Sequence, residues 1–123
     1  MAHTRAGQQA LPEDLIDIAE VVTAYYTRDI DAADPDQQVA FGTSGHRGSS
    51  LDNAFNEQHI WATTQAIVDY RRENNIGGPV YIGRDTHALS EPAMVSALEV
   101  LIANGIEVLV DAAGRYTPTP AVS

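Results

Sequence analysis

The first long stretch of the chain places apolar residues at helical spacing. Leu15, Ile18, Val22 and Tyr26 recur every three or four positions between residues 13 and 28. This pattern is typical of an amphipathic helix with one buried stripe. We therefore expect a helix over 13–28, with these four side chains facing the core.

Two further helices have start and stop signals of their own. Asn56 is expected to cap the second, and an Asn-Asn-Ile-Gly-Gly run at 74–78 ends it. Ser90 is expected to cap the third, and Asn-Gly at 104–105 ends that one. Thr119 before Pro120 is typical of the start of another helix, whose first turn is the last of the chain.

Short apolar segments stand before, between and after the second and third helices. They lie at 39–41, 79–82 and 106–110. Strands that alternate with helices over short connections predict an α/β fold with parallel pairing. We expect three layers, with a mostly parallel sheet between helices.

Three loops should meet at one edge of this sheet, because the carboxyl ends of parallel strands lie side by side. They are residues 42–48, 83–87 and 114–120. Each contains one arginine: Arg47, Arg84 and Arg115. Three guanidinium groups on one rim suit an anion, above all phosphate. The alternative is structural, with Arg84 paired to Asp85 or Asp111 merely to stabilise the fold.

Composition narrows the possible functions. The formal net charge is −10, which disfavours nucleic acid and anionic membranes as partners. All seven basic residues are arginine, so lysine-dependent phosphate loops and Schiff bases are excluded within the chain. There is no cysteine, and the four histidines are far apart, which argues against a zinc site. The acidic loop at 29–37 is interpreted as a solvated linker rather than a metal site.

The amino-terminal residues predict no targeting segment. Residues 1–12 contain no apolar run and are expected to form a disordered leader, without a signal peptide. No stretch has the ~20 apolar residues of a membrane span. A cytoplasmic location fits these features.

The run Phe-Gly-Thr-Ser-Gly-His-Arg-Gly at 41–48 is the sharpest motif. Its glycines let the backbone turn tightly, its hydroxyls and arginine suit phosphate, and His46 could exchange a proton near neutral pH. It lacks the lysine of a nucleotide-phosphate loop and the second glycine of a hydrolase nucleophile elbow. From the residues alone, a phosphate-binding loop and a tight structural turn are equally good interpretations.

This motif resembles the amino-terminal motif of the α-D-phosphohexomutases. Tyr-Ile-Gly-Arg-Asp-Thr-His at 81–87 and Tyr-Thr-Pro-Thr-Pro at 116–120 follow in the same order as in that family. The leader and His46 look like the bacterial phosphoglucomutase branch. The phosphomannomutase and phosphoglucosamine mutase branches are the alternatives. The resemblance runs from about Leu15 to the end and implies an incomplete domain I over residues 13–123.

The resemblance also implies an activity and a site. The family interconverts glucose 1-phosphate and glucose 6-phosphate through a phosphoserine and glucose 1,6-bisphosphate, with Mg²⁺. By match of motif, the residues expected to contact the phosphosugar are Arg47, Ser44, Thr43 and His46. Those expected to brace the loops are Arg84, Asp85, Thr117 and Pro118.

Other family features have no match in the chain. The Thr-Ala-Ser-His-Asn-Pro type segment that holds the phosphoserine is missing, and the neighbours of Ser123 do not fit it. The Asp-x-Asp-x-Asp-Arg metal loop is missing too, and position 87 is histidine where many relatives have arginine. We therefore expect a truncated piece that is inactive alone, binds no metal or cofactor by itself, and has the remaining domains as partners. The alternative is a free-standing α/β module that binds a phosphorylated ligand or a partner protein.

Overall fold

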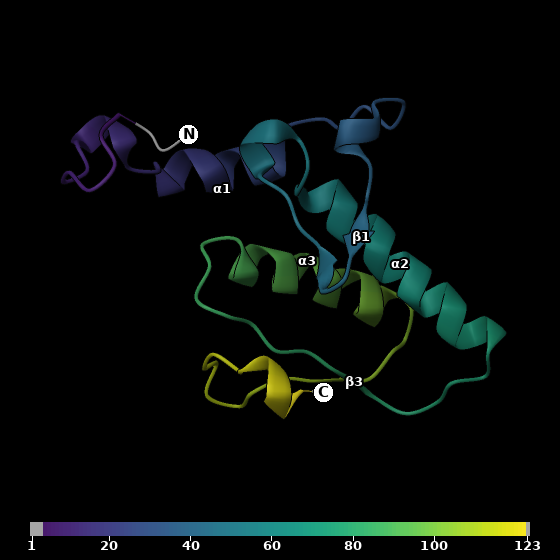
Figure 1. Ribbon diagram of the computed structural model, residues 1–123. Coiled ribbons are helices and arrows are strands. Elements are labelled where there is room, and N and C mark those ends of the chain that lie inside the picture. The colour runs from purple at the N-terminus through teal and green to yellow at the C-terminus, as the bar shows by residue number, and fades with distance from the viewer. Residues whose placement is uncertain (1–3, 123) are drawn as a thin grey trace.

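The computed structural model describes residues 4–122 and shows two long packed helices with small sheets around them (Figure 1). The helices are α1 (Ile18–Thr27), α2 (Glu57–Glu73) and α3 (Ser90–Ala103). The strands are β1 (Phe41–Gly42), β2 (Gly45–His46), β3 (Val80–Tyr81) and β4 (Val108–Leu109). Short 3₁₀ turns are η1 (Pro12–Asp14), η2 (Pro35–Gln37), η3 (Ser50–Asp52) and η4 (Thr119–Ala121). Within residues 4–122, no helix is long and apolar enough to cross a bilayer.

Strands β3 and β4 form the parallel pair that the sequence predicts. Val80 lies opposite Val108 and Tyr81 opposite Leu109, with α3 as the connection between the two strands. A parallel pair joined through a helix is the repeating unit of α/β folds. The predicted α/β class and the pairing of the second and third strands are therefore confirmed.

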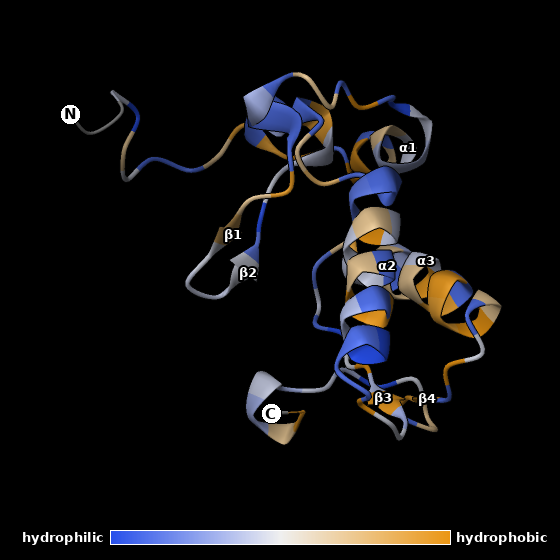
Figure 2. Cartoon of the chain, turned by 90° about the vertical axis from the view of Figure 1, so that its right-hand side faces the viewer, coloured by the Kyte–Doolittle hydropathy of each residue, from blue (hydrophilic) through white to orange (hydrophobic). Residues whose placement is uncertain are grey.

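The prediction for the first strand is wrong. β1 turns back at once and pairs antiparallel with β2, so that Phe41 lies opposite His46. This hairpin is a separate sheet, and Figure 2 shows it on one side of α2, apart from β3 and β4. The turn is possible because Gly45 has a φ of 111°, a conformation that favours glycine. A partner three to five residues away also costs less loop-closure entropy than one about forty residues away.

Helix α1 is shorter than predicted and buries a different face. It begins at Ile18, where the Asp17 carboxylate accepts a hydrogen bond from the Glu20 backbone N–H at 3.2 Å. Its buried residues are Ala24 and Tyr25, near its carboxyl end. Three of the four residues predicted to face the core are instead exposed: Leu15, Ile18 and Tyr26. The reason is that α1 packs on the body through its second half, where Tyr25 reaches α3.

The amino-terminal segment before α1 is partly described. Arg5 forms an ion pair with Asp14, and the Leu11 backbone N–H donates to the same carboxylate at 2.8 Å. Residues 1–3 lie outside the described residues. The disordered leader over residues 1–12 stays a prediction.

Two helix starts differ in how they are capped. Asn56 is the N-cap residue of α2 as predicted, and its backbone N–H donates to His59 Nδ1 at 3.0 Å. The predicted Ser90 cap is wrong, because Leu89 occupies that position and Ser90 is the first residue of α3. The Ser90 hydroxyl donates to the Asp85 carboxylate instead.

The core combines apolar and polar side chains. The buried apolar residues are Ala24, Tyr25, Val68, Leu89 and Leu101, and the buried polar ones are Ser50, Asn56, His59, Thr64 and Ser96. Buried polar groups need hydrogen bonds to offset their desolvation. Ser96 Oγ accepts from the Tyr25 hydroxyl at 2.9 Å and lies 3.0 Å from Glu57 Oε1. These two hydrogen bonds at Ser96 join α1, α2 and α3.

The buried Tyr25 hydroxyl predicts a loss of stability in alkali. Burial raises its pKa to about 12, the hydrogen bond with Ser96 opposes this, and the charge of Glu57 adds to it. A folded-state pKa above the ordinary value of 10.0 stabilises the protein below pH 10, and this contribution is lost as pH rises through 12. We expect the free energy of unfolding to fall by roughly 2–3 kcal/mol over this range. Urea unfolding of the chain at several pH values measures it. Tyr25→Phe should remove that decrease and the exposed control Tyr81→Phe should keep it, so equal profiles would contradict the assignment.

Candidate functional site

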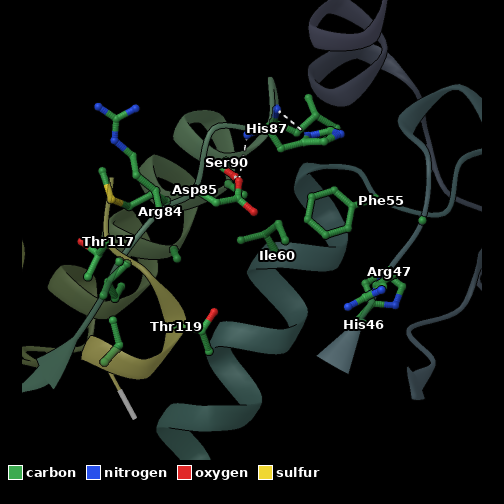
Figure 3. Close-up of a pocket in the computed structure, with 18 residues that line it drawn as sticks. His46, Arg47, Phe55, Ile60, Arg84, Asp85, His87, Ser90, Thr117 and Thr119 are labelled. Carbon is green, nitrogen blue, oxygen red and sulfur yellow. Dashed lines mark hydrogen bonds between the residues drawn. The ribbon is translucent and has the colours of Figure 1, made fainter. Parts of the chain in front are cut away.

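A cavity of about 780 Å³ opens between the hairpin, the start of α2 and the loops after β3 and β4 (Figure 3). The three loops predicted to meet at one edge all contribute to it. Their lining residues are His46, Arg47 and Gly48, then Gly83, Arg84, Asp85 and His87, then Thr117 and Thr119. The structure therefore brings the three predicted loops together, although the first comes from the hairpin rather than from the parallel sheet.

The wall between these loops is apolar. Phe55 and Ile60 lie at the start of α2, and Figure 3 shows them between the hairpin residues and the loop after β3. Ile82, Leu89 and Met94 add apolar surface. The site prediction did not include this wall. Phe55 and Ile60 flank the predicted N-cap Asn56 at the spacing of a hydrophobic staple, and that signal could have found them.

Arg47 is the free cation of this site. It is exposed and has no hydrogen bond or ion pair among residues 4–122. Each of the other arginines has an oxygen acceptor within the described chain. A guanidinium without an internal partner keeps its full capacity to bind an anion with two parallel hydrogen bonds.

His46 precedes Arg47 and is held by other rings. Its ring stacks on Phe55 with centroids 5.7 Å apart and lies 5.5 Å from the ring of His59. Its Nδ1 lies 3.2 Å from both the backbone N and the backbone O of Ala40. Its Nε2 is buried and has no hydrogen-bond partner in the described part of the chain. A buried ring nitrogen in this state can bind an oxygen of a ligand at the cavity.

Thr43 and Ser44, the other two predicted substrate contacts, lie at the tip of the hairpin. Both are exposed, and neither lines the cavity. The structure therefore separates the four residues into two at the cavity and two at the turn. Contact of Thr43 and Ser44 with substrate stays a prediction.

Arg84 connects the loops after β3 and β4. Its guanidinium pairs with Glu91 at 3.1 Å, donates to the Gly114 carbonyl at 2.6 Å and lies 5.0 Å from the centroid of the Tyr116 ring. Its carboxylate partner is thus Glu91, and not Asp85 or Asp111, which the structural alternative named. Arg84 is directed away from Ile60 in Figure 3, so its charge is not aimed at the middle of the cavity.

Asp85 organises the start of α3. Its Oδ1 accepts hydrogen bonds from the Ser90 hydroxyl and, at 2.9 Å, from the His87 backbone N–H. These two bonds, the one from Ser90 foremost, lower the pKa of the Asp85 carboxyl. The carboxylate is therefore charged at neutral pH and is a poor proton acceptor.

Arg115 is not part of the predicted rim of three arginines, because it does not line the cavity. This side chain pairs with Asp111 at 3.0 Å, is largely exposed and does not line the cavity. The hydrogen bonds from Arg115 lower the pKa of the Asp111 carboxyl to about 2. The two charges compensate each other within their own loop, because four residues of turn bring them into contact.

Thr117 closes the cavity from the side of the last loop. Its backbone N–H donates to the Arg84 carbonyl at 2.9 Å. A Cβ on Gly83 would lie 2.8 Å from Thr117 Cβ, so glycine is needed for this approach. Pro118 follows as the exposed residue before η4 and does not line the cavity. The bracing roles of Arg84, Asp85, Thr117 and Pro118 stay predictions.

Comparison with known proteins finds a family match that spans the residues lining this cavity. The model of a family described as "Phosphoglucomutase/phosphomannomutase, alpha/beta/alpha domain I" matches residues 38–123. The chain belongs to the phosphoglucomutase/phosphomannomutase family. Within that family, it is 58% identical over 118 residues to a phosphoglucomutase of Komagataeibacter xylinus. The match covers 96% of this chain and 21% of that relative, so the chain spans about a fifth of the relative's length.

These findings confirm the resemblance and the α/β class expected of domain I in the phosphoglucomutase/phosphomannomutase family. They also place the hairpin loop, the loop after β3 and the loop after β4 inside the matched range. The cavity is therefore built from residues that all belong to the family domain. The segment before residue 38, which includes α1, lies outside the family model but mostly inside the 118 residues aligned with the relative.

The close packing of Gly48 predicts that even one methyl group there destabilises the chain. A Cβ at this position would lie 2.4 Å from the Ala54 carbonyl oxygen, and backbone cannot give way as a flexible side chain would. We expect Gly48→Ala to lower the free energy of unfolding by about 1–3 kcal/mol. Gly77→Ala is the control, because a Cβ there meets nothing within 4 Å. Urea unfolding compares them, and equal stability of the two variants would show that the Gly48 contact is not tight.

Proposed function

We propose that this chain is part of domain I of a phosphoglucomutase that interconverts glucose 1-phosphate and glucose 6-phosphate. The observation that carries the proposal is Arg47, a cation without an internal partner at the rim of a cavity in a family domain. In a chain with a net charge of −10, an unpaired arginine at a cavity indicates a bound anion. The high identity to a phosphoglucomutase supports that branch over the phosphomannomutases.

In this proposal the cavity wall positions a phosphosugar. Arg47 binds phosphate oxygens through its planar fork, and His46 Nε2 binds a further oxygen of the sugar or phosphate. The reaction passes through a phosphoserine and glucose 1,6-bisphosphate, so catalysis consists mainly of positioning and charge stabilisation. None of the serines in the chain stands in the segment expected to hold the phosphoserine. We therefore infer that the phosphoryl donor belongs to another part of the enzyme.

Mg²⁺, which the resemblance implies, does not fit the residues described. Among residues 4–122 there is no group of three or more histidines and carboxylates close enough to hold a metal ion. Asp85 lines the cavity, but its Oδ1 is occupied by two hydrogen bonds. We propose that its ligands come from the remaining domains.

The activity test compares the chain alone with a longer enzyme. We expect no conversion of glucose 1-phosphate by the 123-residue chain with Mg²⁺ and glucose 1,6-bisphosphate present, because in this proposal the phosphoryl donor and the metal ligands belong to other parts of the enzyme. A chimera in which this chain replaces the matching segment of the Komagataeibacter xylinus relative should convert it. A coupled assay for glucose 6-phosphate measures both. Turnover by the chain alone would refute the inactive-fragment proposal, and an inactive but folded chimera would refute the assignment to phosphoglucomutase.

The same assays separate the alternatives. Faster conversion of mannose 1-phosphate than of glucose 1-phosphate by the chimera would favour the phosphomannomutase branch. A free-standing binding module would instead bind glucose 1-phosphate tightly as the isolated chain, which calorimetry detects.

Arg47→Ala should reduce catalysis without unfolding the protein. In the full-length enzyme that contains this chain, we expect kcat/KM to fall. The decrease should correspond to at least ~2 kcal/mol of lost transition-state stabilisation, the scale of one charge-assisted hydrogen bond. The control is Arg72→Ala, an exposed arginine in the last turn of α2 that does not line the cavity. Steady-state kinetics with glucose 1-phosphate measures both variants. Unchanged kcat/KM in Arg47→Ala would remove this residue from the site.

A further inference from the structure

We propose that His59 is a positioning residue for the loop Gly42–Gly48: its ring holds the His46 ring, and thereby Arg47, at the cavity. This inference rests on the proposed function, because it concerns how the same loop reaches the phosphate. The motif at 41–48 does not include His59. This residue lies in the first turn of α2 and does not line the cavity.

His59 is itself rigidly held. It is 3% exposed, its Nδ1 accepts from the Asn56 backbone N–H at 3.0 Å, and its Nε2 lies 2.6 Å from the Gln37 carbonyl oxygen. Because Nδ1 accepts a hydrogen bond, the ring proton lies on Nε2 and is donated to Gln37. Both ring nitrogens are therefore used, and the ring plane is fixed between α2 and the end of η2.

The fixed ring packs against His46. The two ring centroids lie 5.5 Å apart with the planes tilted by 33°, and Phe55 stacks on His46 at 5.7 Å with an angle of 11°. Contacts of this geometry contribute beyond simple burial of area. Phe55 and His59 flank Asn56 in the sequence at −1 and +3, so both His46 contacts originate from the start of α2.

The hairpin needs such an anchor. Each of its strands is two residues long, and Phe41 at its start is 67% exposed. Isolated two-stranded hairpins are marginally stable in water. The His46 side chain attaches β2 to the start of α2, and Arg47 follows it directly.

The ring of His59 and its capping role can be separated by substitution. Glutamine at this helix position can still accept a hydrogen bond from the N-cap N–H, as in a capping box, but has no ring. Phenylalanine keeps the ring and loses both hydrogen bonds. If the ring positions the loop, His59→Gln should harm substrate binding and His59→Phe should harm stability.

The test uses steady-state kinetics and thermal unfolding of the full-length enzyme that contains this chain. A loop that is only partly in its binding position raises the apparent KM in inverse proportion to that population. We expect His59→Gln to raise KM for glucose 1-phosphate about fivefold or more, with kcat within about twofold, as for loss of uniform binding. Its melting temperature should fall because the Gln37 carbonyl loses its donor, but less than that of His59→Phe, which also loses the hydrogen bond from the Asn56 N–H. Gln58→Ala, at an exposed neighbour on the same turn, is the control. His59→Phe should restore KM to nearly the wild-type value at a lower melting temperature.

The outcomes are distinct. A KM for His59→Gln equal to that of Gln58→Ala would overturn the proposal. So would a fall of kcat and of the melting temperature together with a rise of KM, to the same extent in both His59 variants. That pattern would indicate general support of the fold. If His59→Phe does not fold, His59→Gln alone decides. Arg47→Ala is measured alongside: if it keeps full activity, the proposed role of the loop fails, whereas a loss there with normal His59→Gln kinetics refutes only the role of His59.

Discussion

The buried side chain of Asn56 is the contact on which the rest of the structure depends. It is fully inaccessible, and its amide donates to the Ala24 carbonyl at 2.8 Å and to the Ser50 carbonyl at 3.2 Å. These acceptors are in α1 and η3, so a single residue joins the start of α2 to two earlier segments. Its backbone N–H binds His59, which extends the connection to Gln37. An unpaired carbonyl in this place would cost about 1–3 kcal/mol, which makes the arrangement strongly preferred.

This polar centre determines where the cavity forms. Because Asn56 fixes the start of α2, Phe55 and Ile60 on either side of it become the apolar wall, and His59 faces the hairpin. The opposite wall has separate support, since Arg84 ties the loop after β3 to Gly114 and Glu91. The two walls are thus positioned by different networks, and the family motif at the hairpin is attached to the body through aromatic contacts of His46. Polar groups set the positions, and apolar side chains fill the space between them.

Local sequence signals predicted much of this arrangement, and non-local partner choices account for the rest. The N-cap at Asn56, the parallel pairing of β3 with β4 and the convergence of three loops follow from caps, apolar runs and strand direction. The hairpin was missed because the segment at 39–41 has a strand-like composition, and only the turn conformation of Gly45 decides its partner. The sequence does not predict which carboxylate pairs with Arg84, because Asp85, Glu91 and Asp111 are all candidates and only the folded chain brings Glu91 to the guanidinium. The sequence pattern does not distinguish His59 from the other residues of the predicted helix, because its contact with the His46 ring forms only in the folded chain.

The charges around the cavity can be compared with the charge of the proposed phosphosugar. A phosphate monoester carries about 1.5–2 negative charges at neutral pH, whereas Arg47 supplies one positive charge. The charge of Arg84 is matched by Glu91, that of Arg115 by Asp111, and Asp85 adds a negative charge at the cavity. The described residues therefore leave a bound phosphate undercompensated, within a chain whose net charge is −10. Under the proposed function, we therefore expect cationic groups from outside residues 4–122 to complete the phosphate site.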